Sequence, residues 1–349
     1  MKQYNFYAGP SILDPTVLKE TLNTIDAKHG LSLLELSHRG KEITGLFQET
    51  KALVKDLMQL EDRYEILFLH GGARLQNCMI PYNICTKENA SYIDTGIWAK
   101  SSYDESCIIR PTTLLASSAA DNYGHIPKDY KWDGNGYLHI TSNNTVHGTQ
   151  FFDFPKSDKG ALIVDMSSDI LSREMNFNQF GLIYAGLQKN LGTAGGTLVI
   201  IDRNIVEELP HIPNMLNFKK HIDADSMLNT PPVFPVIMCN IVLKWIMNEG
   251  GLEAIEARNI RKAQKLYSEI DQHALLEGFA QREDRSLMNA CFKLKDNSFT
   301  NAFETHIKSK GIVGLDGHRS KGGYRASLYN MLPESHVDYL VKALQEFRG

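Results

Sequence analysis

The chain has 349 residues, of which 42% are hydrophobic and 22% are charged, values that are ordinary for a globular protein. Its formal charge of −4 and isoelectric point near 6.3 leave no dominant basic field, so nucleic acid is not an expected partner. The five cysteines form no C-x-x-C pair and no regular framework, which favours reduced thiols in a cytoplasmic protein without a metal site.

The first predicted elements are helices. Asp14 and Pro15 form a helix start, with the aspartate as N-cap and the proline at the first helical position. A second helix follows SHRGKE at 37–42, because apolar residues recur there at three- and four-residue steps on one face: Ile43, Leu46, Phe47, Leu53, Val54 and Leu57. The N-terminal stretch MKQYNFYAGPSIL lacks a continuous apolar h-region, so no signal peptide is expected. No apolar run approaches the roughly 18 residues of a membrane span, so no such span is expected either.

Six short apolar runs follow along the chain, at 64–70, 90–96, 136–141, 161–166, 181–186 and 196–202. Near-continuous apolar strands that alternate with longer connections predict a mostly parallel sheet covered on both faces. The last run follows the fifth so closely that we expect these two to pair antiparallel, at a sheet edge or as a hairpin.

The C-terminal third has a different pattern. A periodic segment from Leu252 to about His273 predicts one long helix, and the segments beyond it predict strands at 286–294, 311–315 and 323–330 and helices at 301–311 and 336–349. The expected fold is therefore α/β, with a large domain at 15–252 and a smaller α+β domain at 253–349 that includes the N-terminal segment 1–14.

A lysine stands directly after the fifth predicted strand, in YAGLQKNLG at 184–192. Because an ammonium group is costly to desolvate, a lone lysine here most often opens a solvated turn. The other interpretation is a Schiff-base lysine, whose amine becomes useful when its surroundings lower its pKa. Lys189 alone does not decide between them.

An acidic residue ends the preceding predicted strand, since ALIVDMSSD places Asp165 after four apolar residues. Ligands of open α/β sheets lie outside the carboxyl ends of the strands, where Asp165, Gln188 and Lys189 would meet. In pyridoxal-phosphate enzymes a lysine holds the aldehyde as an imine, and an acidic residue keeps the pyridine nitrogen protonated. A turn or helix cap is the alternative role for Asp165.

Two further segments suit such a cofactor. LFLHGGARLQN at 67–77 is a strand, a Gly-Gly turn and a helix start, which would aim the backbone amides of Ala73 and Arg74 at an anion. TGIWAK at 95–100 places Trp98 after another strand, where the indole would stack on a pyridine ring. Taken singly, a Gly-Gly turn is more often structural and a tryptophan more often part of the core.

Nine segments together resemble the phosphoserine aminotransferase family, of the class V group of fold-type-I pyridoxal-phosphate enzymes. They occur in the family's order from residue 5 to about 332: NFYAGPS, SHRGKE, HGGARLQ, TGIWAK, SNNTVHGTQF, DMSSDILSR, YAGLQKNLG, LNTPPVF and GHRSKGGYRASLYN. The resemblance implies that fold, pyridoxal 5'-phosphate as cofactor, and a homodimer with shared active sites.

The resemblance also implies roles for the cofactor residues. Lys189 is the imine lysine, Asp165 takes the pyridinium nitrogen, and Trp98 covers the ring face. Thr145 of NNT reaches the ring hydroxyl. The cofactor phosphate would be held by Ala73, Arg74 and Gln188 of the same chain and by Asn229 and Thr230 of the neighbouring subunit.

The arginines agree with a phosphorylated amino acid as substrate. Phosphoserine carries an α-carboxylate and a phosphate of about −1.5 to −2 charge, so it calls for two separate cationic sites. Arg325 matches the family's α-carboxylate arginine. The residues that match the distal-anion site are His38, Arg39, Arg74, His318 and Arg319. Any one of these arginines taken singly would equally suit a solvated surface.

The implied reaction is ping-pong transfer of the amino group from L-glutamate to 3-phosphooxypyruvate, which gives O-phospho-L-serine and 2-oxoglutarate for serine biosynthesis. Some family members also use a four-carbon phosphorylated analogue in pyridoxine synthesis. The alternatives are a cysteine desulfurase, for which Cys291 is the only candidate cysteine, an alanine–glyoxylate-type transaminase, and a non-catalytic pyridoxal-phosphate carrier. The substrate arginines argue against the carrier.

Overall fold

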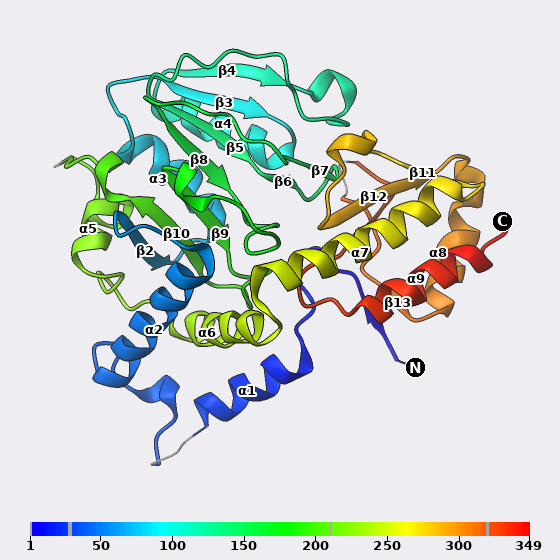
Figure 1. The fold of residues 1–349 in the computed structure, drawn as a ribbon, viewed down its shortest axis with the longest axis horizontal. Coiled ribbons are helices and arrows are strands. Elements are labelled where there is room, and N and C mark those ends of the chain that lie inside the picture. The colour runs from blue at the N-terminus through cyan, green and yellow to red at the C-terminus, as the bar shows by residue number, and fades with distance from the viewer. Residues whose placement is uncertain (1, 27–29, 210, 319–320) are drawn as a thin grey trace.

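The computed structural model describes residues 2–26, 30–209, 211–318 and 321–349. A seven-stranded sheet has the order β2-β10-β9-β8-β5-β3-β4 (Figure 1). Its strands are β2 (Tyr64–Leu69), β3 (Ala90–Asp94), β4 (Thr112–Ser117), β5 (Tyr137–Thr141), β8 (Ala161–Asp165), β9 (Leu182–Gly186) and β10 (Thr197–Asp202).

The sheet is parallel except for one strand. β10 pairs antiparallel with both β2 and β9, whereas the pairs from β9 to β4 are all parallel. The predicted antiparallel pairing of the last two apolar runs is therefore confirmed. Of the two arrangements expected for this pair, the sheet edge is wrong, because β2 pairs with β10 over six residues and is itself the edge. β9 and β10 are consecutive antiparallel strands, which is the expected hairpin. β4, which the sequence did not predict, is the other edge and is largely exposed.

Helices cover both faces of this sheet, as the near-continuous apolar strands require. Alternate strand residues supply the two cores: Ile66 and Phe68 pack on one side, and Leu67 and Leu69 on the other. The first side is covered by α1 (Pro15–Ile25), α2 (Lys41–Met58) and α6 (Val233–Asn248), and the second by α3 (Gly72–Asn83), α4 (Ile97–Ile109) and α5 (Phe218–Asp223). Asp14 caps α1 by accepting from Thr16 N, so the predicted start of this helix is confirmed.

The long helix α7 (Gly251–Gln272) connects the large sheet to a smaller unit (Figure 1). A three-stranded antiparallel sheet there has the order β11-β12-β14, and its strands are β11 (Leu276–Gly278), β12 (Asn289–Leu294) and β14 (Tyr324–Ser327). The helices α8 (Thr300–Ser309) and α9 (Glu334–Glu346) pack with α7 around a separate core.

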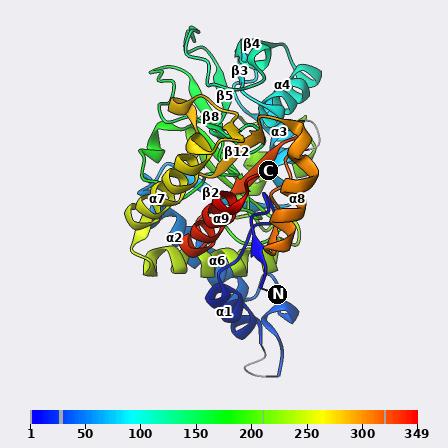
Figure 2. The same cartoon turned by 90° about the vertical axis from the view of Figure 1, so that its right-hand side faces the viewer.

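The N-terminal segment joins this smaller unit. β1 (Tyr4–Asn5) pairs parallel with β13 (Ile312–Val313), and the Tyr4 ring stacks on Tyr339 of α9 at 3.9 Å between centroids. Figure 2 shows the N-terminal strand close to α9. Phe6 is part of the small core. These separate cores support a division into 15–252 and 253–349 with 1–14, which we keep as a proposal.

A short ribbon lies between the two sheets (Figure 1). It consists of β6 (Asn143–Asn144) and β7 (Thr149–Gln150), which pair antiparallel with Asn143 opposite Gln150. Its connecting residues, 145–148, lie between the carboxyl ends of the large-sheet strands and the small sheet, where Thr149 also bridges Arg285.

Across the described ranges, no single helix is long and apolar enough to cross a membrane. The helices α6 and α7 meet the criteria of length and composition only as a pair, and that pair is bent by 84°.

Candidate active site

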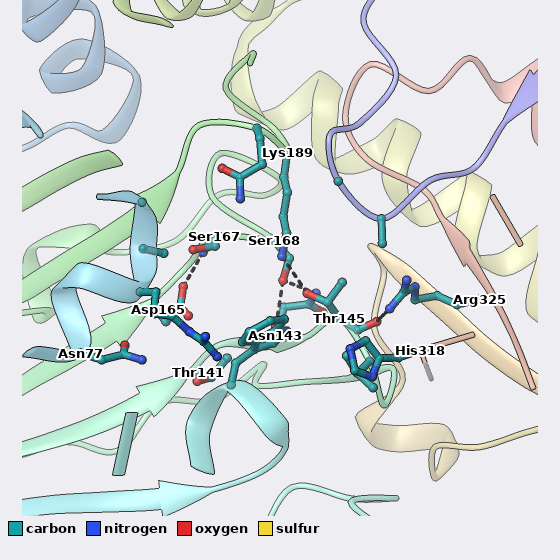
Figure 3. A pocket seen from close by; sticks show the side chains of 18 residues that line it. Asn77, Thr141, Asn143, Thr145, Asp165, Ser167, Ser168, Lys189, His318 and Arg325 are labelled. Atoms are coloured by element: carbon teal, nitrogen blue, oxygen red, sulfur yellow. Dashed lines mark hydrogen bonds between the residues drawn. The ribbon is translucent and has the colours of Figure 1, made fainter. Parts of the chain in front are cut away.

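A cavity of about 510 Å³ opens at the carboxyl ends of the parallel strands. Residues from both sheets and from the N-terminal segment line it (Figure 3). Nine of the residues predicted from the sequence are among them: Ala73, Arg74, Trp98, Thr145, Asp165, Gln188, Lys189, His318 and Arg325.

Lys189 extends into the middle of this cavity, with Asp165 on one side and Arg325 on the other (Figure 3). The buried strand β9 ends at Gly186, and the chain then turns so that the lysine side chain leaves the sheet edge. The amine donates to Thr145 Oγ1 at 3.0 Å. Burial lowers the pKa of the amine to about 8, an effect that nearby Asp165 opposes and Arg325 strengthens. The solvated-turn interpretation does not fit this placement.

The N-terminal segment is hydrogen-bonded to the segment that carries Lys189. Ser11 donates its backbone N–H to Gln188 O at 2.9 Å, and its hydroxyl donates to Lys189 O. Gly9 has a φ of 146°, and a Cβ there would lie 3.5 Å from Lys189 Cγ. The backbone at 8–11 therefore packs against the aliphatic part of the Lys189 side chain.

Asp165 is the last residue of β8 and faces the cavity. The N–H of Ser167 donates to one carboxylate oxygen at 2.8 Å. Burial raises the pKa of Asp165, and the hydrogen bonds from Ser167 and the charge of Lys189 act against that rise. A cation or a protonated ring nitrogen next to this carboxylate would relieve the cost of its burial.

A candidate anion-binding site lies at the N-terminus of α3. Gly71 and Gly72 both have positive φ, at 86° and 66°, which turns the chain from β2 into the helix. A Cβ at Gly71 would lie 2.5 Å from Leu75 Cδ2, so only glycine fits there. The backbone N–H groups of Ala73 and Arg74 lie in the first helical turn, where they have no intrahelical acceptor and the helix dipole favours an anion.

Trp98 and Arg74 stand together at the cavity. Trp98 is in the first turn of α4, and the Arg74 guanidinium lies 5.8 Å from the centre of its ring. This distance permits a cation–π contact. The exposed indole lines the cavity and is absent from the cores, so the core interpretation of Trp98 does not hold.

Arg325 reaches the cavity from the small sheet. It lies on β14, its Nη1 donates to Thr145 O at 3.4 Å, and its buried Nε has no hydrogen-bond partner in the described chain. His318 lines the same end of the cavity. The predicted Arg319 lies outside the described residues. This end of the cavity is cationic and retains unused donor capacity for an acidic ligand.

Four predicted residues do not line the cavity: His38, Arg39, Asn229 and Thr230. Arg39 donates to Met227 O at 3.4 Å, and Thr230 O lies 2.7 Å from His70 Nε2. The contact with Met227 places Arg39 beside the segment that carries Asn229 and Thr230. The side chain of Thr230 is exposed, as is that of Arg39.

Several cavity residues were not predicted individually. Thr141 ends β5, Asn143 follows it, and Ser167 and Ser168 follow β8, so the rule that identified Asp165 applied to them as well. Asn77 lies on α3 one turn beyond Arg74, and Tyr184 donates to its Oδ1 at 3.2 Å. Gly9 carried no local signal, because its contact with Lys189 joins residues 180 positions apart.

Cys291 does not fit a reactive thiol. It is fully buried on β12, and its Sγ lies 3.5 Å from Val146 O. Burial raises the pKa of the thiol to about 12, so the thiolate is scarce near neutral pH. The desulfurase alternative therefore has no nucleophile in Cys291. Among the described residues there is also no group of three potential metal ligands.

The chain matches the family described as aminotransferase class-V over residues 3–340. It is 48% identical to the phosphoserine aminotransferase of Flavobacterium psychrophilum and 45% identical to that of Parabacteroides distasonis. These alignments cover 100% and 99% of this chain, and 99% of each relative.

Solved structures agree with these matches. The phosphoserine aminotransferase from Bacillus circulans subsp. alkalophilus superposes with a TM-score of 0.95 at 41% identity, covering 99% of this chain and 98% of that one. The pyridoxal-phosphate-bound phosphoserine aminotransferase from Trichomonas vaginalis gives a TM-score of 0.92 at 33% identity, covering 99% of this chain and 100% of that one. The chain has their fold-type-I architecture and belongs to the class-V aminotransferase family, among the phosphoserine aminotransferases.

Proposed function

We propose that this chain catalyses the reversible transfer of an amino group from L-glutamate to 3-phosphooxypyruvate, with O-phospho-L-serine and 2-oxoglutarate as products. The observation that carries the proposal is the buried Lys189 amine, which lies between a carboxylate, Asp165, and a cationic end of the cavity at Arg325. The names of the relatives supply phosphoserine as one substrate, and the family resemblance implies L-glutamate and 3-phosphooxypyruvate.

Pyridoxal 5'-phosphate is the cofactor that the cavity fits. Three of its functional groups have a chemically matched counterpart: an amine for its aldehyde, a buried carboxylate for its ring nitrogen, and a helix N-terminus for its phosphate. Bound there, the cofactor would act as an electron sink for the substrate α-carbon. We assign the phosphate to Ala73, Arg74 and Gln188, the ring nitrogen to Asp165, the ring face to Trp98 and the ring hydroxyl to Thr145.

Lys189 has two tasks in this proposal. Its amine would hold the cofactor between turnovers and, when free, would carry a proton to or from the substrate α-carbon. A pKa of about 8 suits the second task, because roughly a fifth of the amine is then neutral near physiological pH and can accept a proton, far more than at the ordinary lysine value. Thr145 Oγ1, 3.0 Å away, orients the amine.

Arg325 binds the α-carboxylate that every substrate of the reaction carries. Its partnerless Nε and its Nη groups offer the planar fork that matches a carboxylate. Arg74 and His318 line the cavity and are assigned to the distal anion, together with Arg319. Both cationic sites are needed because glutamate and the phosphorylated substrates each carry two separated anionic groups.

Four residues outside the cavity suggest a shared site. We infer a homodimer in which His38 and Arg39 reach the partner's distal-anion site, and Asn229 and Thr230 reach the partner's cofactor phosphate. The exposed side chains of Arg39 and Thr230 support this inference. We further propose a cytoplasmic enzyme, since its five thiols are unpaired.

A coupled assay tests the function. The purified protein, loaded with cofactor and supplied with L-glutamate, is compared on 3-phosphooxypyruvate, pyruvate and glyoxylate. Charged hydrogen bonds are worth about 1.5–3 kcal/mol each, so two contacts to the phosphate predict a kcat/KM at least about a hundredfold higher for the phosphorylated acceptor. Equal rates on pyruvate or glyoxylate would reject the assigned substrate class and favour the alanine–glyoxylate alternative.

A further inference from the structure

The ribbon of β6 and β7 contacts both the Lys189 amine and the Arg325 guanidinium, which both line the cavity. Through its connecting residue Thr145, it accepts from Lys189 Nζ at Oγ1 and from Arg325 Nη1 at the backbone carbonyl, at 3.0 and 3.4 Å (Figure 3). Lys189 belongs to the large sheet and Arg325 to the small one. The separation between the amine and the guanidinium therefore depends on the position of this ribbon.

The ribbon is attached to the small sheet by side-chain hydrogen bonds. Asn143 donates to Asn289 Oδ1 at 2.8 Å, and Gln150 Oε1 accepts from the backbone N–H of Leu287 at 2.9 Å. Asn289 begins β12, the strand in which Cys291 lies opposite Arg325. A shift of the ribbon would therefore be transmitted to the strand that carries the guanidinium.

On its other side the ribbon is attached to the segment after β8. Asp169 is fully buried, and its carboxylate accepts from Gln150 Nε2 at 3.1 Å and from the hydroxyl of Ser142. Asp169 is the fourth residue after Asp165, and Ser142 Oγ also lies 3.0 Å from Asp165 O. Asp169 thus connects the ribbon to the backbone of the carboxylate assigned to the ring nitrogen.

We propose that Asp169 and Gln150 are positioning residues for substrate binding. They hold the ribbon so that the Lys189 amine and the Arg325 guanidinium keep the separation that substrate binding requires. The inference rests on the proposed role of Arg325. Neither residue lines the cavity, so both would act only through the ribbon.

The direction of the hydrogen bonds makes the proposal specific. Because Leu287 N–H occupies Gln150 Oε1, the amide must present its N–H groups to Asp169, which must accept. Gln150→Glu keeps the acceptor for Leu287 but places two carboxylates about 3 Å apart, which is unfavourable for both. Adding Asp169→Asn restores a donor–acceptor pair in the reverse direction, with Ser142 still able to donate to the new amide oxygen.

The experiment uses the cofactor-loaded enzyme and three readouts. These are the KM for L-glutamate, the dissociation constant of maleate (an unreactive dicarboxylate) followed by cofactor absorbance, and the dissociation constant of the cofactor. For Gln150→Glu we expect the KM for L-glutamate and the dissociation constant of maleate to rise about tenfold or more, while cofactor affinity stays within about threefold. Gln150→Glu/Asp169→Asn should return both to within about threefold of wild type.

Asp202→Asn is the matched control. Asp202 is a buried carboxylate at the end of β10, paired with Arg63 at 2.8 Å and remote from the ribbon. It should lower the midpoint of thermal unfolding without changing maleate binding by more than about twofold. If Gln150→Glu does not fold, Gln150→Met removes both hydrogen bonds without adding charge and carries the same expectation.

Lack of rescue in the double variant, or a lowered unfolding midpoint with unchanged maleate binding, would overturn the positioning role. Arg325→Lys separates this outcome from failure of the proposed function. If Arg325→Lys leaves maleate binding unchanged, the assignment of the α-carboxylate site is wrong. If Arg325→Lys weakens maleate binding and the ribbon variants do not, only the present inference fails.

Discussion

Replacing Lys189 by methionine in the cofactor-free protein should change how stability depends on pH. The amine has a pKa of about 8 in the folded chain and 10.5 as its ordinary value. Between these values the unfolded chain binds more protons than the folded chain, so wild-type stability rises with pH across this window. Below about pH 8 the folded protein bears the full cost of burying the ammonium, and above about pH 10.5 it bears none.

The structure sets the size of the effect. A difference of about 2.5 pKa units, at about 1.4 kcal/mol per unit, corresponds to about 3 kcal/mol. Methionine retains a stem that packs against Gly9, and the lost hydrogen bond to Thr145 costs about 1 kcal/mol. Lys189→Met should therefore be more stable than wild type by about 2 kcal/mol at pH 7, and less stable by about 1 kcal/mol at pH 11.

Urea unfolding of both cofactor-free proteins from pH 7 to 11 measures this difference. Lys244→Met, which removes a surface ion pair with Glu49, is the control and should stay within about 1 kcal/mol of wild type throughout. A constant difference between Lys189→Met and wild type across the range would refute the claim that Lys189 is buried as an ammonium with a lowered pKa.

Three further predictions concern the loaded enzyme. Asp165→Asn should bind cofactor but transaminate far more slowly, because a neutral amide does not stabilise a protonated ring; near-normal single-turnover rates would contradict this. Arg325→Ala should damage both half-reactions, at about 2–5 kcal/mol, whereas Arg39→Ala should mainly impair phosphorylated substrates, and equal losses on all substrates would remove the distal-site assignment. Mixing Lys189→Ala with Thr230→Val subunits should recover part of the activity through heterodimers with one intact site, and an active monomer in sedimentation would exclude the shared site.

The sequence predicted the large sheet well, because its strands are buried on both faces and appear as continuous apolar runs. It did not predict β4, whose side chains are mostly exposed and whose sequence, TTLLAS, carries no strong periodicity. It also did not predict the inner position of β10, since that position depends on β2, more than 120 residues earlier, returning beside it. The order of strands in a sheet is a property of long-range pairing.

In the cavity, too, features with a local sequence signal were predictable and those that depend on long-range contacts were not. Asp165, Gln188 and Lys189 were predictable because they end neighbouring strands, and their meeting point follows from the parallel sheet. The contacts of Gly9 and Ser11 with the lysine segment were not, because nothing near residues 9–11 indicates what lies opposite. The hydrogen bond between Asp169 and Gln150 was likewise not predictable, since in the sequence each is an ordinary turn or strand residue, and only the fold brings them within 3.1 Å.

Peptide mapping after borohydride fixation tests the central claim most directly, since it identifies the residue that holds the cofactor. The purified protein is loaded with pyridoxal 5'-phosphate, reduced, digested and analysed by mass spectrometry, with Lys189→Ala treated in parallel. The account predicts that the added pyridoxyl mass is found on Lys189 and that the variant carries none. A modified lysine elsewhere in the wild-type chain, or equal labelling of the variant, would contradict the account.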